Sequence, residues 1–208
     1  MQKFDPANLD ELKATLKKTT KELSPVLIKE IIIKKHAADE IGQVVNRIIS
    51  TTGRKNKHSE ILLVMDNTEI FSGGKNIKEE IIKNLQRSNL QLHEIVLKHE
   101  ENPGGIVHAD YKNVDTVKRK LKQNTILVSV GSGTVTDISK HAAYLFSEEN
   151  SIKEIPFIVV QTANTVTAFT SNIAVLFKDG VKRTYPSRYP DYIISDINIL
   201  KDAPQKLT

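Results

Sequence analysis

The sequence predicts an α/β domain with a Rossmann-like, largely parallel sheet flanked by helices. From residue 31 onward, short apolar runs alternate with longer segments of helical period, which is typical of this fold class. The apolar runs are continuous rather than alternating, as expected of strands that are covered on both faces. The chain has 208 residues, of which 39% are hydrophobic and 26% charged, so one or at most two ordinary globular domains are expected.

Five apolar runs are the predicted strands of the sheet. They are 61–65 (ILLVM), 92–97, 125–130 (TILVSV), 157–160 (FIVV) and 192–195. Near the end of the chain, 173–177 and 181–185 flank Lys178-Asp179-Gly180. Because Asp-Gly supplies the φ > 0 positions of a tight turn, these two runs predict a β-hairpin.

Four segments between the strands have the periodicity of helices: 36–50, 74–87, 113–121 and 134–146. In the first of them, apolar residues recur at i, i+3, i+4, i+7 and i+8 from Ile41, which places them on one helix face. A further amphipathic helix is predicted within 1–24, closed by Ser24-Pro25, and another helix is expected near the DAPQKLT end. We therefore assign 1–25 to an N-terminal helical extension and 26–208 to the α/β domain.

Composition excludes several classes of protein. The chain has no cysteine, so disulfide scaffolds, thiolate zinc sites and cysteine nucleophiles are excluded. The net charge of +5 comes from lysines scattered among nearly as many acids, and no tryptophan is present for base stacking, so we expect no nucleic-acid partner. No apolar run approaches the roughly 18 to 20 residues of a membrane helix, and the N-terminus lacks a signal-peptide core. We expect a cytoplasmic protein without a membrane partner.

Two glycines after the strongest predicted strand mark the first candidate site. Gly131 and Gly133 follow TILVSV and open a helix at Thr134. Glycine lets a ligand approach the backbone, and the free N–H groups of a first helical turn favour a phosphate. A plain tight turn between strand and helix is the alternative. A Rossmann fingerprint is not present, because its third glycine is missing.

The ends of two other predicted strands supply further candidates. Asp66 ends LLVMD at the carboxyl edge, where open α/β sheets bind ligands, so its carboxylate is a candidate acceptor for a ligand hydroxyl. A turn or cap aspartate is the alternative. Residues 161–171 (QTANTVTAFTS) are rich in hydroxyl and amide groups without any charge, which suits hydrogen bonding to a ligand, although a merely polar loop fits equally. The six histidines never fall at i, i+3 or i, i+4 spacing, so they indicate no metal site.

In this order, VSVGSGTVTDISKHAAY, PFIVVQTANTVTAFTSNIAVLFKDGVKRT and YIISDINILKDAP resemble the sn-glycerol-1-phosphate dehydrogenase family, especially its bacterial branch. That family is grouped with glycerol dehydrogenases, iron-containing alcohol dehydrogenases and 3-dehydroquinate synthases. The resemblance covers about residues 26–208. It implies an NAD- or NADP-dependent oxidoreductase of phospholipid metabolism that interconverts dihydroxyacetone phosphate and glycerol 1-phosphate. In the family, a divalent metal (Zn, Ni or Fe) acts as Lewis acid while the nicotinamide delivers hydride.

The resemblance also assigns roles to residues of this chain. Asp66 matches the acid at the first strand end, and Ser171 matches a serine beside the cofactor. The pyrophosphate loop is matched by Gly131, Ser132, Gly133, Thr134 and Val135, and a second cofactor turn by Thr162, Ala163, Asn164 and Thr165. No arginine or lysine stands near Asp66 in the sequence to favour a 2′-phosphate, so the choice between NADH and NADPH stays open. No catalytic residue is assigned.

Two departures from the family pattern limit what the resemblance implies. Thr167 stands where the family has an aspartate that contacts substrate, and Gln161 replaces the usual proline of the turn. The family's metal ligands, an aspartate and two histidines, lie in a helical second domain expected just after Thr208. This metal-binding domain is therefore absent from the chain, which we expect to be inactive alone and to expose apolar surface where that domain would sit.

Several alternatives remain open at this point. The substrate is expected to be a phosphorylated triose or a polyol, so glycerol or another polyol is an alternative to dihydroxyacetone phosphate. An inactive nucleotide-binding or partner-binding module is an alternative of a different class. A 3-dehydroquinate synthase fits least, because the Gly-Gly-Lys run expected after the second turn is missing. A homo-oligomer is compatible with the sequence but is not indicated by it.

Overall fold

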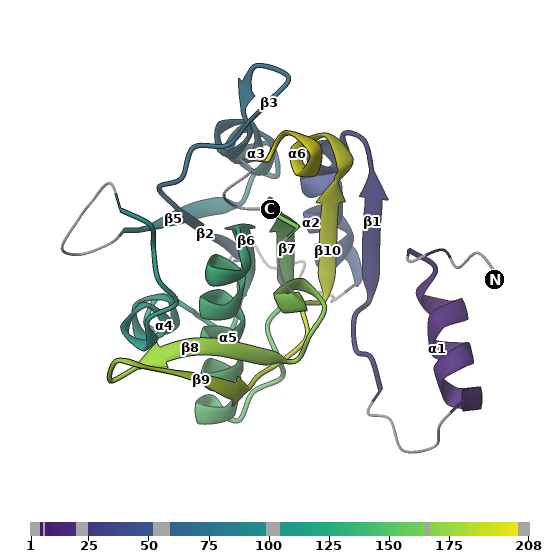
Figure 1. The fold of residues 1–208 in the computed structure, drawn as a ribbon. Coiled ribbons are helices and arrows are strands. Elements are labelled where there is room, and N and C mark those ends of the chain that lie inside the picture. Colours follow the sequence, from purple (N-terminus) through teal and green to yellow (C-terminus); the bar gives the residue numbers. More distant parts are fainter. Residues whose placement is uncertain are drawn as a thin grey trace.

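The computed structural model describes residues 5, 7–19, 25–51, 59–98, 105–164 and 167–203. They form a six-stranded sheet in the order β1-β10-β7-β6-β2-β5, and every neighbouring pair is parallel (Figure 1). The strands are β1 (Glu30–Lys34), β2 (Glu60–Asp66), β5 (Gln91–Leu97), β6 (Thr125–Gly131), β7 (Phe157–Gln161) and β10 (Tyr192–Asp196). The predicted α/β fold with a parallel sheet is confirmed.

Helices cover both faces of this sheet. They are α1 (Leu9–Thr19), α2 (Ile41–Thr51), α3 (Ile77–Gln86), α4 (Tyr111–Lys118), α5 (Gly133–Asn150) and α6 (Ile197–Asp202). Successive side chains of a strand point to opposite faces. Ile126, Val128 and Val130 of β6 therefore pack with α2 and α3, whereas Leu127 packs with α4 and α5. Within the described residues, none of the helices combines the length and hydropathy that a membrane span requires.

The hairpin near the end of the chain is also confirmed. It consists of β8 (Ile173–Lys178) and β9 (Val181–Pro186), paired antiparallel. Both turn residues, Asp179 (φ 54°) and Gly180 (φ 74°), adopt the positive φ that a tight primed turn requires. Figure 1 shows the hairpin on the same side of the sheet as α4 and α5. It thus adds a second layer outside α5 on that side.

Two predicted helix starts are wrong. The helix predicted from residue 36 begins at Ile41, because His36 is left-handed (φ 59°) and a 3-10 turn, Ala37–Glu40, precedes α2. The helix predicted from residue 74 begins at Ile77, since Gly73 and Gly74 have positive φ in the turn of a small hairpin, β3 (Phe71–Ser72) and β4 (Lys75–Asn76). A short helix, α6, also begins directly after β10, and the further helix expected near the DAPQKLT end lies largely outside the described residues.

The helix predicted over residues 1–24 is present in the part of this span that the structure describes. Of residues 1–24 the structure describes 5 and 7–19, and α1 occupies most of them. Leu9 of α1 packs with Ile28 and Ile193, and Lys13 Nζ donates a hydrogen bond to the Ile28 carbonyl at 2.9 Å. The edge strand β1, which follows, is not among the strands predicted from apolar runs. The division of the chain into an extension and an α/β domain stays a prediction.

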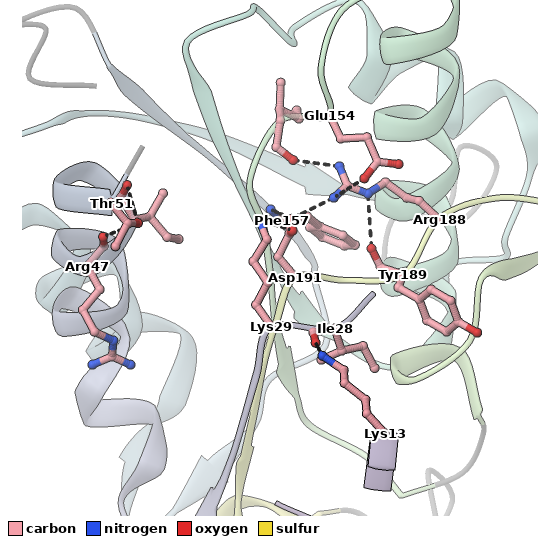
Figure 2. Close-up of polar contacts among 12 residues, drawn as sticks. Lys13, Ile28, Lys29, Arg47, Thr51, Glu154, Phe157, Arg188, Tyr189 and Asp191 are labelled. Atoms are coloured by element: carbon pink, nitrogen blue, oxygen red, sulfur yellow. Dashed lines mark hydrogen bonds and ion pairs between the residues drawn. The ribbon is translucent and has the colours of Figure 1, made fainter. Parts of the chain in front are cut away.

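A buried charge network closes the amino edge of the sheet. Asp191 precedes β10, and its Oδ2 accepts hydrogen bonds from Phe157 N at 2.9 Å and from Arg188 Nη2 at 2.7 Å (Figure 2). Its Oδ1 forms an ion pair with Lys29 Nζ at 2.7 Å. Arg188, which is 4% exposed, also donates from Nη1 to the Ile155 carbonyl at 2.7 Å. This network holds the starts of β1, β7 and β10 together.

Candidate functional site

A cleft of about 950 Å³ opens at the carboxyl edge of the sheet, where β2 and β6 end. The chain passes from β2 through α3 to the edge strand β5, then returns through α4 on the opposite face to β6. The helices that follow β2 and β6 therefore leave the sheet on opposite sides. This is a topological switch point, the place where open α/β sheets bind ligands.

Six of the residues predicted to form a site line this cleft. Asp66 comes from the end of β2, three residues from the start of α5, and two from the loop before β8: Asp66, Ser132, Gly133, Thr134, Thr167 and Ser171. The lining also includes His108, Asp137 and Lys182, which the sequence did not single out as site residues. The fold thus brings together residues from three loops that lie up to a hundred positions apart.

The N-terminus of α5 is open toward the cleft. Ser132 occupies the N-cap position, but its side chain makes no capping hydrogen bond. The first N–H groups of a helix have no intrahelical partner, and the helix dipole adds positive potential there. At the start of an 18-residue helix, such groups can bind the phosphate of a ligand.

Gly131 and Val135 shape this turn rather than line the cleft. A Cβ on Gly131 would lie 2.5 Å from Val135 Cγ2 and 2.8 Å from Val135 Cβ, which is closer than atoms can approach. Glycine is therefore needed so that the first turn of α5 can pack against the end of β6. Val135 itself is fully buried in the core.

Asp66 is not a lone carboxylate. Lys78, in the first turn of α3, donates to Asp66 Oδ1 and, at 2.7 Å, to the Asp66 backbone carbonyl. The Thr68 N–H donates to the same Oδ1 at 3.1 Å. Both side chains of the pair are buried, and this burial lowers the pKa of Lys78, while the Asp66 charge opposes the shift. No basic residue stands near Asp66 in the sequence, but the fold brings Lys78, twelve residues away, into contact with its carboxylate.

A second buried pair, Asp137 and Lys140 on α5, was missed by sequence reasoning. Lys140 is 0% exposed and lies 3.0 Å from Asp137 Oδ1. It also donates to the Ala168 carbonyl at 2.9 Å and to the Ser171 carbonyl at 3.3 Å. Burial lowers the pKa of Lys140, with Asp137 opposing. Their i, i+3 spacing, which places opposite charges on one helix face, was the available signal.

Through this pair, α5 holds the loop that lines the far wall of the cleft. Asp137 Oδ2 accepts a hydrogen bond from the Val175 N–H at 3.1 Å. The 3-10 turn Thr167–Phe169 and Ser171 are therefore fixed to the same helix whose N-terminus opens on the cleft. Thr167 is exposed on this wall and brings a hydroxyl where an aspartate was expected from the resemblance.

The second predicted cofactor turn lies beside the cleft but does not line it. Thr162 and Ala163 are buried, Asn164 is exposed, and Thr165 lies outside the described residues. The Thr162 N–H donates to the Gly131 carbonyl at 3.4 Å, which joins this turn to the glycine turn. Within the described part of the chain, the buried Thr162 Oγ1 has no hydrogen-bond partner.

Gln161 orders this turn by hydrogen bonding. Its Nε2 donates to the Ala163 carbonyl at 3.1 Å, and its Oε1 accepts from Ser195 Oγ at 2.7 Å. A proline would fix the turn through its ring instead. The substitution at position 161 is thus compatible with an ordered loop after β7.

No metal centre is formed by the described residues, among which no three His, Asp or Glu side chains gather to hold an ion. The fold and the cleft define a doubly wound α/β domain with the uncapped N-terminus of α5 at its switch point. A sequence model of the iron-containing alcohol dehydrogenases matches residues 40–204. The chain belongs to this family, which confirms the resemblance at family level.

Similar proteins of known sequence agree with this assignment. The chain is 32% identical over 185 residues to glycerol-1-phosphate dehydrogenase [NAD(P)+] of Bacillus subtilis (strain 168), and the matched region covers 88% of this chain and 41% of the relative. It is 25% identical over 200 residues to the Bacillus velezensis protein of the same name, covering 96% of this chain and 45% of that one. The chain thus spans less than half the length of these relatives.

Solved structures share the fold. Sulfoacetaldehyde reductase from Bifidobacterium kashiwanohense, solved in complex with NAD+, superposes with a TM-score of 0.63 at 18% identity, covering 89% of this chain and 48% of that chain. NADH-dependent butanol dehydrogenase A from Thermotoga maritima gives a TM-score of 0.62 at 17% identity, and the match covers 89% of this chain and 46% of that chain. At these identities the similarity establishes the fold alone.

Proposed function

We propose that this chain is the NAD(P)-binding part of a metal-dependent glycerol-1-phosphate dehydrogenase-like oxidoreductase. One observation carries the proposal: the uncapped N-terminus of α5 and the carboxylate of Asp66 line the same cleft at the switch point of the sheet. The helix terminus suits a pyrophosphate, and the carboxylate suits a ribose hydroxyl. The names of the similar Bacillus proteins, glycerol-1-phosphate dehydrogenase [NAD(P)+], support the proposed cofactor and reaction.

Each predicted site residue has a place in this proposal. Ser132, Gly133 and Thr134 bind the pyrophosphate through backbone N–H groups, while Gly131 and Val135 allow the close packing of that turn. The proposed second cofactor turn comprises Thr162, Ala163, Asn164 and Thr165, the last of which lies outside the described residues. Ser171 is the proposed serine beside the cofactor, on the wall that Lys140 holds. The bound cofactor supplies hydride, and this chain binds and orients it.

The metal has no place among the described residues, so we derive no step through it. We propose that a divalent ion (Zn, Ni or Fe) is held by residues outside the described part of the chain. Dihydroxyacetone phosphate is the proposed substrate. Because Thr167 replaces the expected aspartate on the cleft wall, glycerol, another polyol or another phosphorylated ketone is the second candidate. We propose a cytoplasmic location and leave self-association as a prediction.

Cofactor binding tests the first part of the proposal. We expect the protein, purified as its gene encodes it, to enhance NADH or NADPH fluorescence with a saturable Kd. Thr134→Asp places a negative charge where the pyrophosphate binds and should weaken binding about tenfold or more. Thr116→Asp makes the same change on the exposed surface of α4 and should leave the Kd unchanged. Failure of the wild-type protein to bind either nucleotide would contradict the proposal.

Turnover tests the second part. Reduction of dihydroxyacetone phosphate is compared with oxidation of glycerol and other polyols, with Zn, Ni or Fe added in turn. A preference for dihydroxyacetone phosphate supports the glycerol-1-phosphate reading, whereas a preference for a polyol selects the second candidate. Nucleotide binding without turnover of any substrate would favour the inactive-module alternative.

A further inference from the structure

The buried pair at the adenosine end of the cleft carries an inference about cofactor choice, which rests on the proposed function. Asp66 ends β2 and lines the cleft, and Lys78 lies directly behind it. Lys78 is 8% exposed, and its two hydrogen bonds to described residues both go to Asp66. The pair is thus a fixed feature of the cleft wall rather than a passing surface contact.

An aspartate without a cation at this place of an α/β sheet favours NAD over NADP. Its carboxylate accepts hydrogen bonds from the ribose hydroxyls, and its charge repels the 2′-phosphate that distinguishes NADP. Discrimination therefore depends on the net charge at the strand end. Here that charge is not −1, because the ammonium group of Lys78 is paired with the carboxylate.

The remaining hydrogen-bonding capacity of the pair suits both cofactors. Within the described residues, the hydrogen bonds of the Asp66 carboxylate go to Oδ1, which leaves Oδ2 as an acceptor for a ribose hydroxyl. Lys78 uses two of the three N–H donors of its ammonium group on Asp66. Because the pair carries no net charge, it does not repel a 2′-phosphate.

We infer that Lys78 determines cofactor specificity: by neutralising Asp66, it allows the cleft to accept both NAD(H) and NADP(H). Lys78 is not itself a lining residue of the cleft and acts through the charge and position of the Asp66 carboxylate. The preference between the two cofactors then follows the net charge of the pair. A purely structural lysine would change stability without changing this preference.

A charge series tests the inference. The Kd values of NAD+ and NADP+ are measured by calorimetry for the wild-type protein and for Lys78→Met, Asp66→Asn and the double variant. The wild-type values should lie within about tenfold of each other. Lys78→Met leaves a lone carboxylate and should shift the preference about tenfold toward NAD+, whereas Asp66→Asn leaves a lone ammonium and should shift it toward NADP+. The neutral double variant should return the preference close to the wild-type value.

The matched control is Lys83→Met, which removes an exposed lysine of the same helix that pairs with Glu80, and it should leave both Kd values unchanged. If Lys78→Met does not fold, Asp66→Asn and the double variant still differ by one charge and should differ in preference. A preference that stays within about twofold across the series would overturn the inference. Loss of binding of both cofactors by the wild-type protein would instead contradict the proposed function.

Discussion

The two edges of the sheet differ in how far their buried polar groups are paired within the chain. At the amino edge, the Asp191 carboxylate is bonded by a backbone N–H and by two cations, and Arg188 is bonded to a backbone carbonyl as well. Glu60, at the start of β2, accepts from Lys122 Nζ at 2.7 Å and Thr125 Oγ1 at 3.1 Å. These charges hold strands together.

At the carboxyl edge, bonding capacity is left over. The N-cap side chain of α5 makes no capping bond, the Thr162 hydroxyl is buried without a partner among the described residues, and Asp66 keeps Oδ2 for a ligand. Ile106 and Ile173 line the cleft although they are 68% and 42% exposed. Exposed apolar surface at this edge fits the expectation that another part of the protein covers it.

The comparison indicates that stability and function are separated along the strands. The buried charges of Asp191, Arg188 and Glu60 at the amino edge are paired within the chain, so changing them should alter the free energy of unfolding and leave cofactor binding intact. Groups at the carboxyl edge are arranged for a ligand, so changing them should alter binding as well. The predictions below test this separation, from the largest effect to the smallest.

Asp191→Ala should have the largest effect on stability. The substitution removes the buried carboxylate partner of the Arg188 guanidinium and leaves it only the partly exposed Glu154, and the loss of one partner costs about 3–5 kcal/mol in comparable buried pairs. The free energy of unfolding is measured by urea denaturation. Asp115→Ala removes a partly exposed partner of Lys118 and should cost no more than about 1 kcal/mol. An equal loss of unfolding free energy in the two variants would show that the amino-edge network contributes no more to stability than a surface ion pair.

Gly131→Ala should alter stability and binding together. The added methyl overlaps Val135, and overpacking of this kind costs about 1–3 kcal/mol. Because relief of the overlap moves the first turn of α5, NADH affinity should fall too. Gly180→Ala, in the hairpin turn at φ 74°, should cost about 1 kcal/mol from backbone strain. If Gly180→Ala weakened NADH binding as much as Gly131→Ala, the loss of affinity could not be assigned to the first turn of α5.

Strand positions were predictable from sequence because a doubly covered strand is a continuous apolar run. β2, β5, β6, β7 and β10 match their predicted runs to within one residue at each end. Helix starts were less predictable, because the helical spacing of apolar residues extends to residues that precede the first helical turn of the backbone. His36 and Gly74 fit the helical pattern, yet both are left-handed. The signal that was available at Gly74 is the Gly-Gly pair itself.

The sequence predicted the site residues that directly follow strands. It did not predict the ion pairs that form between residues brought together by the fold. Asp66 and the glycine turn follow apolar strands, so their shared edge could be deduced. The pairing of Lys78 with Asp66 requires the β3–β4 hairpin to return α3 to the end of β2, which no local pattern specifies. Lys140 was missed because it stands between Ser139 and His141, a polar stretch typical of an exposed helix face, which the structure nevertheless buries.

The smallest predicted effect concerns pH. His141, on α5, is 3% exposed, its Nδ1 has no hydrogen-bond partner among the described residues, and its ring packs near Tyr111, Tyr144 and Tyr185. Burial lowers the pKa of His141 below its ordinary value of 6.5, so the unfolded chain binds a proton that the folded chain does not. Stability should therefore fall as pH drops below about 6.5, by no more than about 1.4 kcal/mol per pH unit from this group.

Comparison of the wild-type protein with His141→Gln isolates this contribution. The variant retains a polar side chain but cannot titrate, so its free energy of unfolding should depend less on pH between about 5 and 7. Above pH 7 the difference between the two proteins should be constant, because both folded and unfolded His141 are then neutral. Since His141 contacts neither edge, NADH affinity at pH 7.5 should be the same in both, whereas a pH dependence that survives the substitution would assign the effect to another group.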